Sequence, residues 1–307
     1  MRIKNLFCKS VALAIVIAFL ANPAAIGQRQ TKPVAAKPMI FAVLNDGKMI
    51  EPIGWIDNGG LGAPTGGDAT AEEFKNFSTT NYKKGATYKL IFGGAVGGLV
   101  TVNGSDPSSD CAKNMATVSV TATKAKLAGK VMALATNAPG AKKGTGVRRL
   151  PTPAERVMAD NLVKAEFAKQ GNSAEIIETR DYHNLTAVDV DGDGKIELVG
   201  SFWVKPDAKT RNTLFFIADK GSDGKYRTGF GKYNSIKEDS VMNGEISTVD
   251  DGIYHELLLD VFDIDGDGVS EVFTYVQSFE GAGFNVYMRS AGKWDSVFEG
   301  ANYHCGF

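Results

Sequence analysis

The 307-residue sequence lacks two short motifs that mark common hydrolytic active sites. It contains neither the G-x-S-x-G motif of a serine nucleophile nor the HExxH motif of a zinc protease. Their absence excludes the usual forms of these two enzyme classes and favours a protein that is not an enzyme. A catalytic site built on a pair of carboxylates remains an alternative, because spacing along a β-rich chain does not reveal which carboxylates lie close together.

Histidine is scarce, with three copies, which leaves little material for a histidine-based site. His183 and His255 lie shortly before two repeated acidic segments, and this shared position predicts a structural role. His304 is followed directly by Cys305, but neighbours in a strand point to opposite faces. We therefore expect no His–Cys catalytic pair and assign no catalytic residue.

The chain has no excess of positive charge for binding nucleic acid. Lysine and arginine number 34, and aspartate and glutamate 35, so the formal net charge is −1. Residues 1–27 carry three basic residues and no acidic one, so their removal leaves a net charge of about −4. A nucleic-acid partner is therefore not expected.

The N-terminus has the pattern of a cleaved signal peptide. Its positively charged part contains Arg2, Lys4 and Lys9. The apolar run 11–21 is too short to span a membrane comfortably. Small residues at 25 and 27 predict cleavage before Gln28, which makes 1–27 a signal peptide and 28–38 a flexible leader. A retained membrane anchor is the alternative. We expect a secreted or periplasmic protein without a membrane span after cleavage.

Cysteine is as scarce as histidine. Cys8 precedes the apolar run, so Cys111 and Cys305 are the two that remain after cleavage. An exported chain with an even number of cysteines can form a disulfide. We predict a Cys111–Cys305 disulfide that ties the N-terminal region to the end of the chain. Two separate thiols are the alternative.

Two acidic segments are the most informative feature of the sequence. Residues 189–197 and 263–271 both read D-x-D-G-D-G-x-x-E. Aspartates at every second position place three carboxylates on one side of a tight loop, where they repel unless a cation lies among them. The glycines supply the positive φ angles that such a loop needs. An oxygen-only ligand set in an irregular loop favours calcium.

We predict calcium ligands at loop positions one, three, five, seven and nine, with position seven contributing its backbone carbonyl. In the first loop these residues are Asp189, Asp191, Asp193, Lys195 and Glu197. In the second loop they are Asp263, Asp265, Asp267, Val269 and Glu271. An EF-hand would need glutamate at position twelve and flanking helices. Position twelve is Gly200 in the first loop and Thr274 in the second. The flanking residues are β-branched and aromatic, so we expect each loop to join two strands.

The motif resembles the FG-GAP or VCBS repeat, the calcium-loop hairpin of integrin-type β-propellers and of many secreted bacterial proteins. The matching residues are Asp189, Asp191, Asp193, Gly194 and Glu197, and Asp263, Asp265, Asp267, Gly268 and Glu271. The family often ends its motif in aspartate, and the glutamate here keeps the carboxylate. The resemblance covers roughly residues 175–307 and implies calcium-binding hairpins in that part of the chain.

The strand-like runs and turns predict a mainly β protein with three parts after the leader. Residues 39–138 are expected to form an N-terminal β domain. Residues 139–172 form a linker with a helix that begins at a capping box, residues 152–155. Four basic residues of this linker are expected to be solvated, namely Lys142, Lys143, Arg148 and Arg149.

Residues 173–307 read as a duplication. Each unit is expected to have four strands, like a propeller blade, with the calcium loop between the first two. Propellers usually need at least four blades. We therefore expect two small sheets packed against each other, with a partial propeller as the alternative.

Two functional classes fit these features. The first is a secreted calcium-binding protein that acts as a non-enzymatic binding or structural module. The second is a secreted hydrolase or lyase on a polymer, with the calcium loops as structural accessories. In the first case the partner is an extracellular or envelope protein or carbohydrate, which the sequence does not identify.

Overall fold

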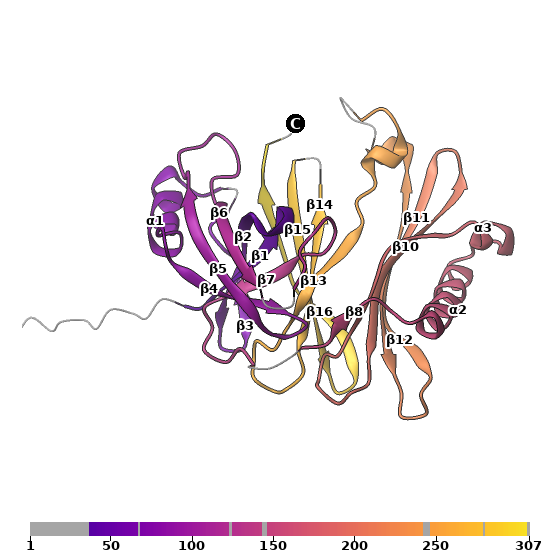
Figure 1. Cartoon of the computed structure of the whole chain (residues 1–307). Helices are drawn as coiled ribbons and strands as arrows, with labels where there is room; N and C mark the ends of the chain where they lie inside the picture. Colours follow the sequence, from indigo (N-terminus) through magenta and orange to yellow (C-terminus); the bar gives the residue numbers. More distant parts are fainter. Residues whose placement is uncertain are drawn as a thin grey trace, which may run out of the picture. The chain divides into compact units, whose positions relative to one another are not determined.

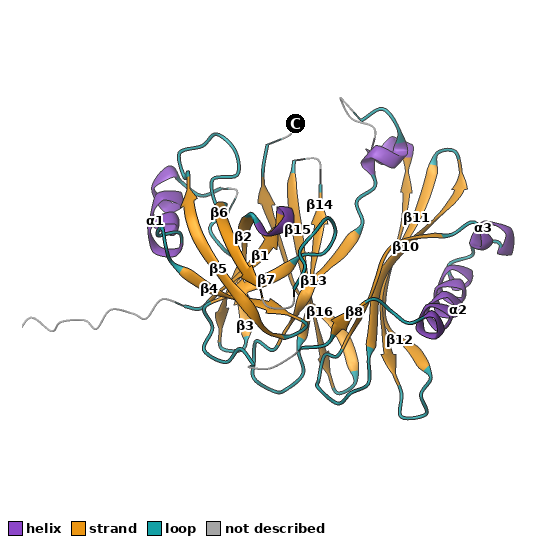
Figure 2. Ribbon diagram, in the orientation of Figure 1, coloured by secondary structure: helices purple, strands orange, loops and turns teal. Residues whose placement is uncertain are grey.

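Figure 1 shows a computed structural model of the chain, which describes residues 37–305 apart from 67, 123–124, 143–145, 242–245 and 279. The predicted signal peptide, residues 28–36 of the leader and Lys143 lie outside the described residues. Strands dominate the described part (Figure 2), so the prediction of a mainly β protein is confirmed. Lys37–Phe307 form one compact unit. No helix within the described ranges is long and apolar enough to cross a membrane.

The N-terminal strands build a barrel. They are β1 (Met39–Leu44), β2 (Met49–Asp57), β3 (Gly60–Gly62), β4 (Thr87–Phe92), β5 (Ala95–Ser105), β6 (Ala116–Ala122) and β7 (Ala133–Thr136). Six of them pair in the order β1-β7-β4-β5-β6-β2, and β2 pairs back with β1, so the sheet closes. β3 extends from β2. Closure leaves these six strands without a free edge, and Phe41, Leu90 and Val100 fill one core.

Short elements complete the barrel region. A 3-10 turn (Asn45–Gly47) joins β1 to β2, and helix α1 (Ala71–Asn81) precedes β4. The Thr70 side chain caps α1 by accepting a hydrogen bond from the Glu73 N–H. The core side chains of α1 are Phe74 and Phe77, which are buried.

Two antiparallel meanders follow the barrel in the sequence. The first contains β9 (Asp181–Val188), β10 (Glu197–Asp207), β11 (Thr210–Lys220) and β12 (Tyr226–Lys237), with the short β8 (Arg148–Arg149) on the outer edge of β9. The second contains β13 (Glu256–Phe262), β14 (Glu271–Gln277), β15 (Gly281–Ser290) and β16 (Lys293–Tyr303). Two short helical turns, α4 (Glu238–Val241) and Val249–Gly252, lie between β12 and β13 in the sequence. Each acidic loop joins the first two strands of its meander.

The four-stranded sheet lies between the barrel and the five-stranded sheet (Figure 1). Successive residues of a strand face opposite sides, and β14 uses both. Phe273 packs in one core with Leu134 of the barrel, and its neighbour Val272 packs in another with strands of the five-stranded sheet. In that second core the ring centroids of Tyr287 and Phe215 are 5.2 Å apart. The two meander sheets therefore pack face to face.

Helix α2 (Pro153–Lys169) covers the other face of the five-stranded sheet, together with the short α3 (Ala174–Glu178). Val163 and Phe167 of α2 are fully buried against this sheet. The Glu155 N–H donates to Thr152 Oγ1 at 3.2 Å, and the Thr152 N–H donates to Glu155 Oε2 at 2.8 Å. The predicted capping box is thus confirmed.

Arg148 corrects one expectation, because it is buried and not solvated. Its Nη1 donates to Asp260 Oδ2 at 2.8 Å, and the two side chains are only 5% and 0% exposed. The N–H groups of Gly93 and Gly94 also donate to this carboxylate, at 3.0 Å each, and Val261 donates at 2.7 Å. Burial raises the pKa of Asp260, and the Arg148 guanidinium together with the Val261 and Gly93 N–H groups opposes that shift. The ion pair joins the barrel turn, β8 and β13.

Arg149 is also paired, and its partner makes the stability of α2 depend on pH. Arg149 donates to both oxygens of Glu155 at 2.7 and 2.8 Å. This pairing, aided by the Thr152 hydrogen bonds, lowers the pKa of Glu155 from 4.5 to about 2. A carboxyl whose pKa falls on folding stabilises the protein above its unfolded pKa. That contribution disappears as pH falls from about 5 toward 2.

We expect Glu155→Gln to cost about 1–2 kcal/mol of unfolding free energy at pH 7, since Arg149 is more than a third exposed and solvent weakens the pair. The difference between wild type and variant should shrink steadily as pH falls from about 5 toward 2. Urea unfolding at several pH values measures it. A difference that stays constant over this range would contradict the assignment.

Candidate metal sites

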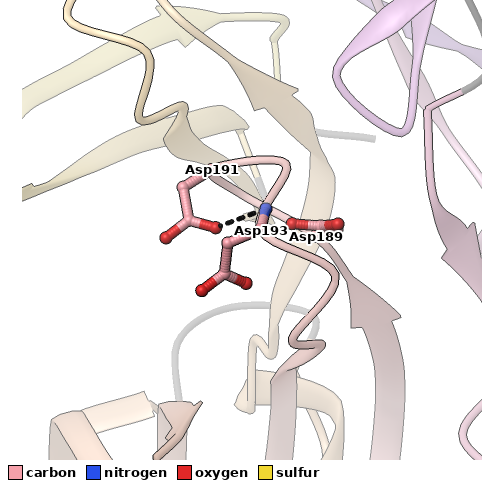
Figure 3. Close-up of side chains that lie close together, drawn as sticks. All are labelled: Asp189, Asp191 and Asp193. Atoms are coloured by element: carbon pink, nitrogen blue, oxygen red, sulfur yellow. Dashed lines mark hydrogen bonds between the residues drawn. The ribbon is translucent and has the colours of Figure 1, made fainter. Parts of the chain in front are cut away.

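The first acidic loop gathers three carboxylates from consecutive odd positions (Figure 3). Asp189, Asp191 and Asp193 each place one oxygen so that all three lie within 4.8 Å of one another. Calcium holds its oxygen ligands at about 2.3–2.6 Å, so ligands on opposite sides of one ion lie about 5 Å apart. The spacing therefore fits one ion between the three aspartates. The triad could hold a metal ion.

The second loop repeats this arrangement. Asp263, Asp265 and Asp267 again place three oxygens within 4.8 Å of one another. Asp263 is partly buried, and Asp265 and Asp267 are exposed. The structure thus brings together the first three predicted ligands of each loop.

Both loops are shaped by the same five backbone-to-carboxylate hydrogen bonds. The aspartate at position one accepts hydrogen bonds from the N–H groups at positions four and six. The aspartate at position three accepts from the N–H group at position five, and the aspartate at position five accepts from the N–H group at position seven. The glutamate at position nine accepts from position two. The ten distances lie between 2.6 and 3.1 Å. Position six, Gly194 or Gly268, has φ of 80° or 96°, which glycine adopts without strain.

Glu197 and Glu271, the predicted ligands at position nine, are not members of the two triads. Both are buried, and each accepts the N–H of its loop's second residue, Val190 or Ile264. Burial raises the pKa of both glutamates to about 8. The hydrogen bond that both glutamates share is the one from the loop backbone.

Position seven differs between the loops. The N–H groups of Lys195 and Val269 both donate to the aspartate at position five, at 2.7 Å. The Lys195 Nζ also pairs with Asp193 Oδ2, whereas Val269 carries no charge. The first loop therefore contains a cation of its own.

Arg289 is a second cation of the first loop, and the motif did not reveal it. Its Nη2 donates to Asp191 Oδ2, and its Nη1 lies 3.2 Å from Asp219 Oδ1 and 3.7 Å from Glu197 Oε1. Arg289 belongs to β15 of the other meander, so only the packing of the two sheets brings it here. No local signal in the sequence marks this contact.

The second loop has a weaker positive neighbour. Lys142 Nζ lies 3.9 Å from Asp263 Oδ2, and it donates to the Gly268 carbonyl at 3.2 Å. The two loops also touch each other, because the Ser270 N–H donates to the Val190 carbonyl at 2.7 Å. Since less positive charge compensates its aspartates, the second loop has the greater need for a cation.

The histidines do not join either triad within the described residues. The rings of His183 and His255 stack, with centroids 4.1 Å apart and planes at 15°. His304 Nε2 lies 2.6 Å from Oε1 of the fully buried Glu51.

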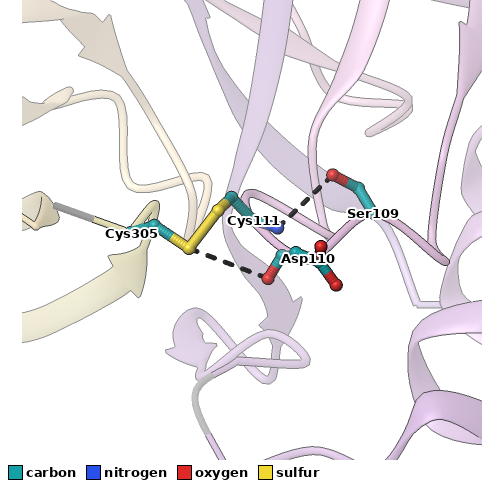
Figure 4. The surroundings of a disulfide bond; sticks show 4 residues. All are labelled: Ser109, Asp110, Cys111 and Cys305. Atoms are coloured by element: carbon teal, nitrogen blue, oxygen red, sulfur yellow. Dashed lines mark hydrogen bonds between the residues drawn. A yellow bond between two sulfur atoms is a disulfide. The ribbon is translucent and has the colours of Figure 1, made fainter. Parts of the chain in front are cut away.

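Cys111 and Cys305 form a disulfide, as predicted (Figure 4). Their Cα atoms are 5.4 Å apart across 194 residues of sequence. The neighbouring Asn302 side chain accepts from Asn114 and donates to the Pro52 carbonyl, both at 2.9 Å. The end of β16 is therefore attached to the barrel by covalent and by polar contacts, and Cys305 is not a free nucleophile.

No protein-family model, curated protein or solved structure matches this chain. The resemblance to FG-GAP or VCBS repeats therefore rests on the two motifs and stays a prediction.

Proposed function

We propose that this protein is an exported, non-enzymatic binding or structural module whose two acidic loops bind calcium and so stabilise the fold. The observation that carries the proposal is the repetition of one loop. Both copies have the same aspartate triad and the same five hydrogen bonds. Oxygen-only ligands on a loop with this geometry suit calcium.

The placement of the loops explains why a bound ion would stabilise the folded protein. Each loop connects the first two strands of a meander, and the Ser270–Val190 hydrogen bond joins the loops. Without an ion, three carboxylates repel at each turn. A bound cation removes this repulsion only in the folded state, so binding free energy becomes folding free energy.

Two further features support the remaining parts of the proposal. The Cys111–Cys305 disulfide suits an oxidising compartment, as secretion or export to the periplasm would provide. The two meanders, each with its loop between the first two strands, suit a pair of FG-GAP-like units packed on an N-terminal β domain.

Single substitutions should separate the two sites. At free calcium ten times the dissociation constant, each site contributes about 1.4 kcal/mol. Asp191→Ala and Asp265→Ala should each reduce the stoichiometry measured by calorimetric titration from two calcium ions to one. Asp265→Ala should remove the larger share of the calcium-dependent stabilisation, because Arg289 and Lys195 already compensate the first loop.

The matched control is Asp223→Ala, which alters an aspartate of the exposed β11–β12 turn outside both triads. It should leave calcium binding unchanged. Magnesium should substitute poorly, because it demands near-octahedral geometry and resists dehydration. Two calcium ions still bound by the Asp191→Ala, Asp265→Ala double variant would overturn the proposed sites.

A further inference from the structure

A cavity of about 320 Å³ lies beside the first half of β9, and its lining contains no residue of the two acidic loops. β8 pairs only with Ala187 and Val188 of β9, so the rest of this edge has no strand partner among the described residues. The cavity is lined by that open edge, by the residues that lead into α2, and by the end of β4. Its volume is at the lower end of the range of small-molecule sites, about 300–1,000 Å³.

The lining of this cavity is positively charged. It contains Lys130, Arg148, Arg149 and Arg156, and no aspartate or glutamate. Asp260 neutralises Arg148, and Glu155 neutralises Arg149. Lys130 and Arg156 have no carboxylate partner in the described part of the chain: Lys130 Nζ lies 3.3 Å from the His183 carbonyl, and the Arg156 guanidinium lies 5.9 Å from the Tyr182 ring centroid. These two positive charges therefore have no salt bridge among the described residues.

His183 forms a neutral wall of the cavity. Lys130 Nζ lies 3.3 Å from His183 Nδ1, and a lysine ammonium can only donate. Nδ1 therefore accepts, which places the ring proton on Nε2. Burial, together with the nearby His255 and Lys130, lowers the pKa of His183 to about 4. The stacked His255 ring fixes this wall in place, and the excess charge belongs to Lys130 and Arg156.

Apolar side chains gather at the same place. Leu150 is 74% exposed and Tyr182 is 52% exposed, and both line the cavity. Single exposed apolar residues need no explanation. A group of them around one positively charged hollow indicates a ligand with an apolar face and a negative end.

We propose that this cavity binds a small organic anion in which a carboxylate is attached to a six-membered ring. Arg156 offers a planar fork that matches a carboxylate, and Lys130 adds a second positive charge. The ring lies against Tyr182 and Leu150, and the cavity volume accommodates one such ring with its substituents. Two sources share this chemistry: an aromatic acid, or a uronic acid at the end of a polysaccharide. The proposal does not depend on calcium binding.

The test compares two carboxylates with their neutral counterparts, using titration calorimetry on the mature protein. The probes are benzoate and glucuronate, and their neutral counterparts are benzyl alcohol and glucose. Each probe is titrated once in calcium and once in chelator. One carboxylate should bind saturably at up to about 10 mM, and at least about tenfold more tightly than its neutral counterpart, as expected for a charge-assisted hydrogen bond. The carboxylate that binds identifies the source. Failure of both, or equal binding of the neutral probes, would overturn the proposal.

Matched variants test the two named cations. Arg156→Gln and Lys130→Gln should each weaken binding of the carboxylate by about tenfold, and the melting temperature should stay at the wild-type value. Lys126→Gln, on the same loop as Lys130, and Lys169→Gln, at the other end of α2, remove a charge outside the cavity lining and should change nothing. Wild-type affinity in the Arg156→Gln, Lys130→Gln double variant would also refute the assignment.

Discussion

Replacing Asp260 by alanine is expected to lower the free energy of unfolding by about 3–5 kcal/mol, the range found when one partner of a buried ion pair is removed. The substitution leaves the Arg148 guanidinium buried at 5% exposure without its counter-charge. It also removes the acceptor of the Gly93, Gly94 and Val261 N–H groups. These donors belong to the barrel turn and to β13, so the loss should weaken the contact between the barrel and the four-stranded sheet.

The control for this prediction is an exposed ion pair of the same protein. Lys37 and Asp57 lie 2.6 Å apart, with side chains 49% and 45% exposed. Asp57→Ala should therefore change the unfolding free energy by less than about 1 kcal/mol. Urea unfolding of both variants, in calcium and at pH 7, gives the two values. Equal small effects would show that the buried pair does not hold the two sheets together.

Loss of the Cys111–Cys305 disulfide should have an effect of similar size. The two cysteines are separated by 194 residues, and loop-closure entropy for a loop of that length amounts to about 5 kcal/mol. Reduction frees the unfolded chain from this constraint. The polar contacts of Asn302 and His304 keep the chain end beside the barrel in the folded state. The stability of the reduced protein should therefore fall chiefly because its unfolded state gains entropy.

The measurement compares denaturant unfolding of the oxidised protein, the reduced protein and the Cys111→Ser, Cys305→Ser double variant. The last two should agree, and reductant should not affect the double variant. If reductant left the wild-type midpoint unchanged, the disulfide would contribute nothing to stability.

The features that the sequence predicted correctly depend on nearby residues. The two residues of the capping box, Thr152 and Glu155, are three positions apart, and α2 begins at this box as expected. The three aspartates that come together in each acidic loop lie within five positions, and β-branched and aromatic residues mark the strands on either side. The disulfide was the one correct long-range prediction, and it followed from two cysteines remaining after the expected cleavage.

The features that the sequence did not predict depend on residues far apart in the chain. Barrel closure requires β1 to pair with both β2 and β7, and no local pattern specifies that pairing. Arg148 stands among basic residues of an expected linker, and only the buried Asp260, 112 residues later, reveals its role. Arg289 likewise meets the first loop only because two sheets pack. The basic residues around Arg148 therefore led to the prediction of a solvated side chain, whereas the fold pairs Arg148 with a buried carboxylate.

The central claim is that calcium in the two acidic loops stabilises the fold, and the melting temperature of the wild-type protein tests it most directly. Two sites at ten times the dissociation constant contribute about 2.8 kcal/mol. For a folded unit of this size we expect millimolar calcium to raise the melting temperature by about 5–10 °C above its value in chelator. Magnesium at the same concentration should produce a much smaller rise. An identical melting temperature in chelator and in calcium would contradict the account.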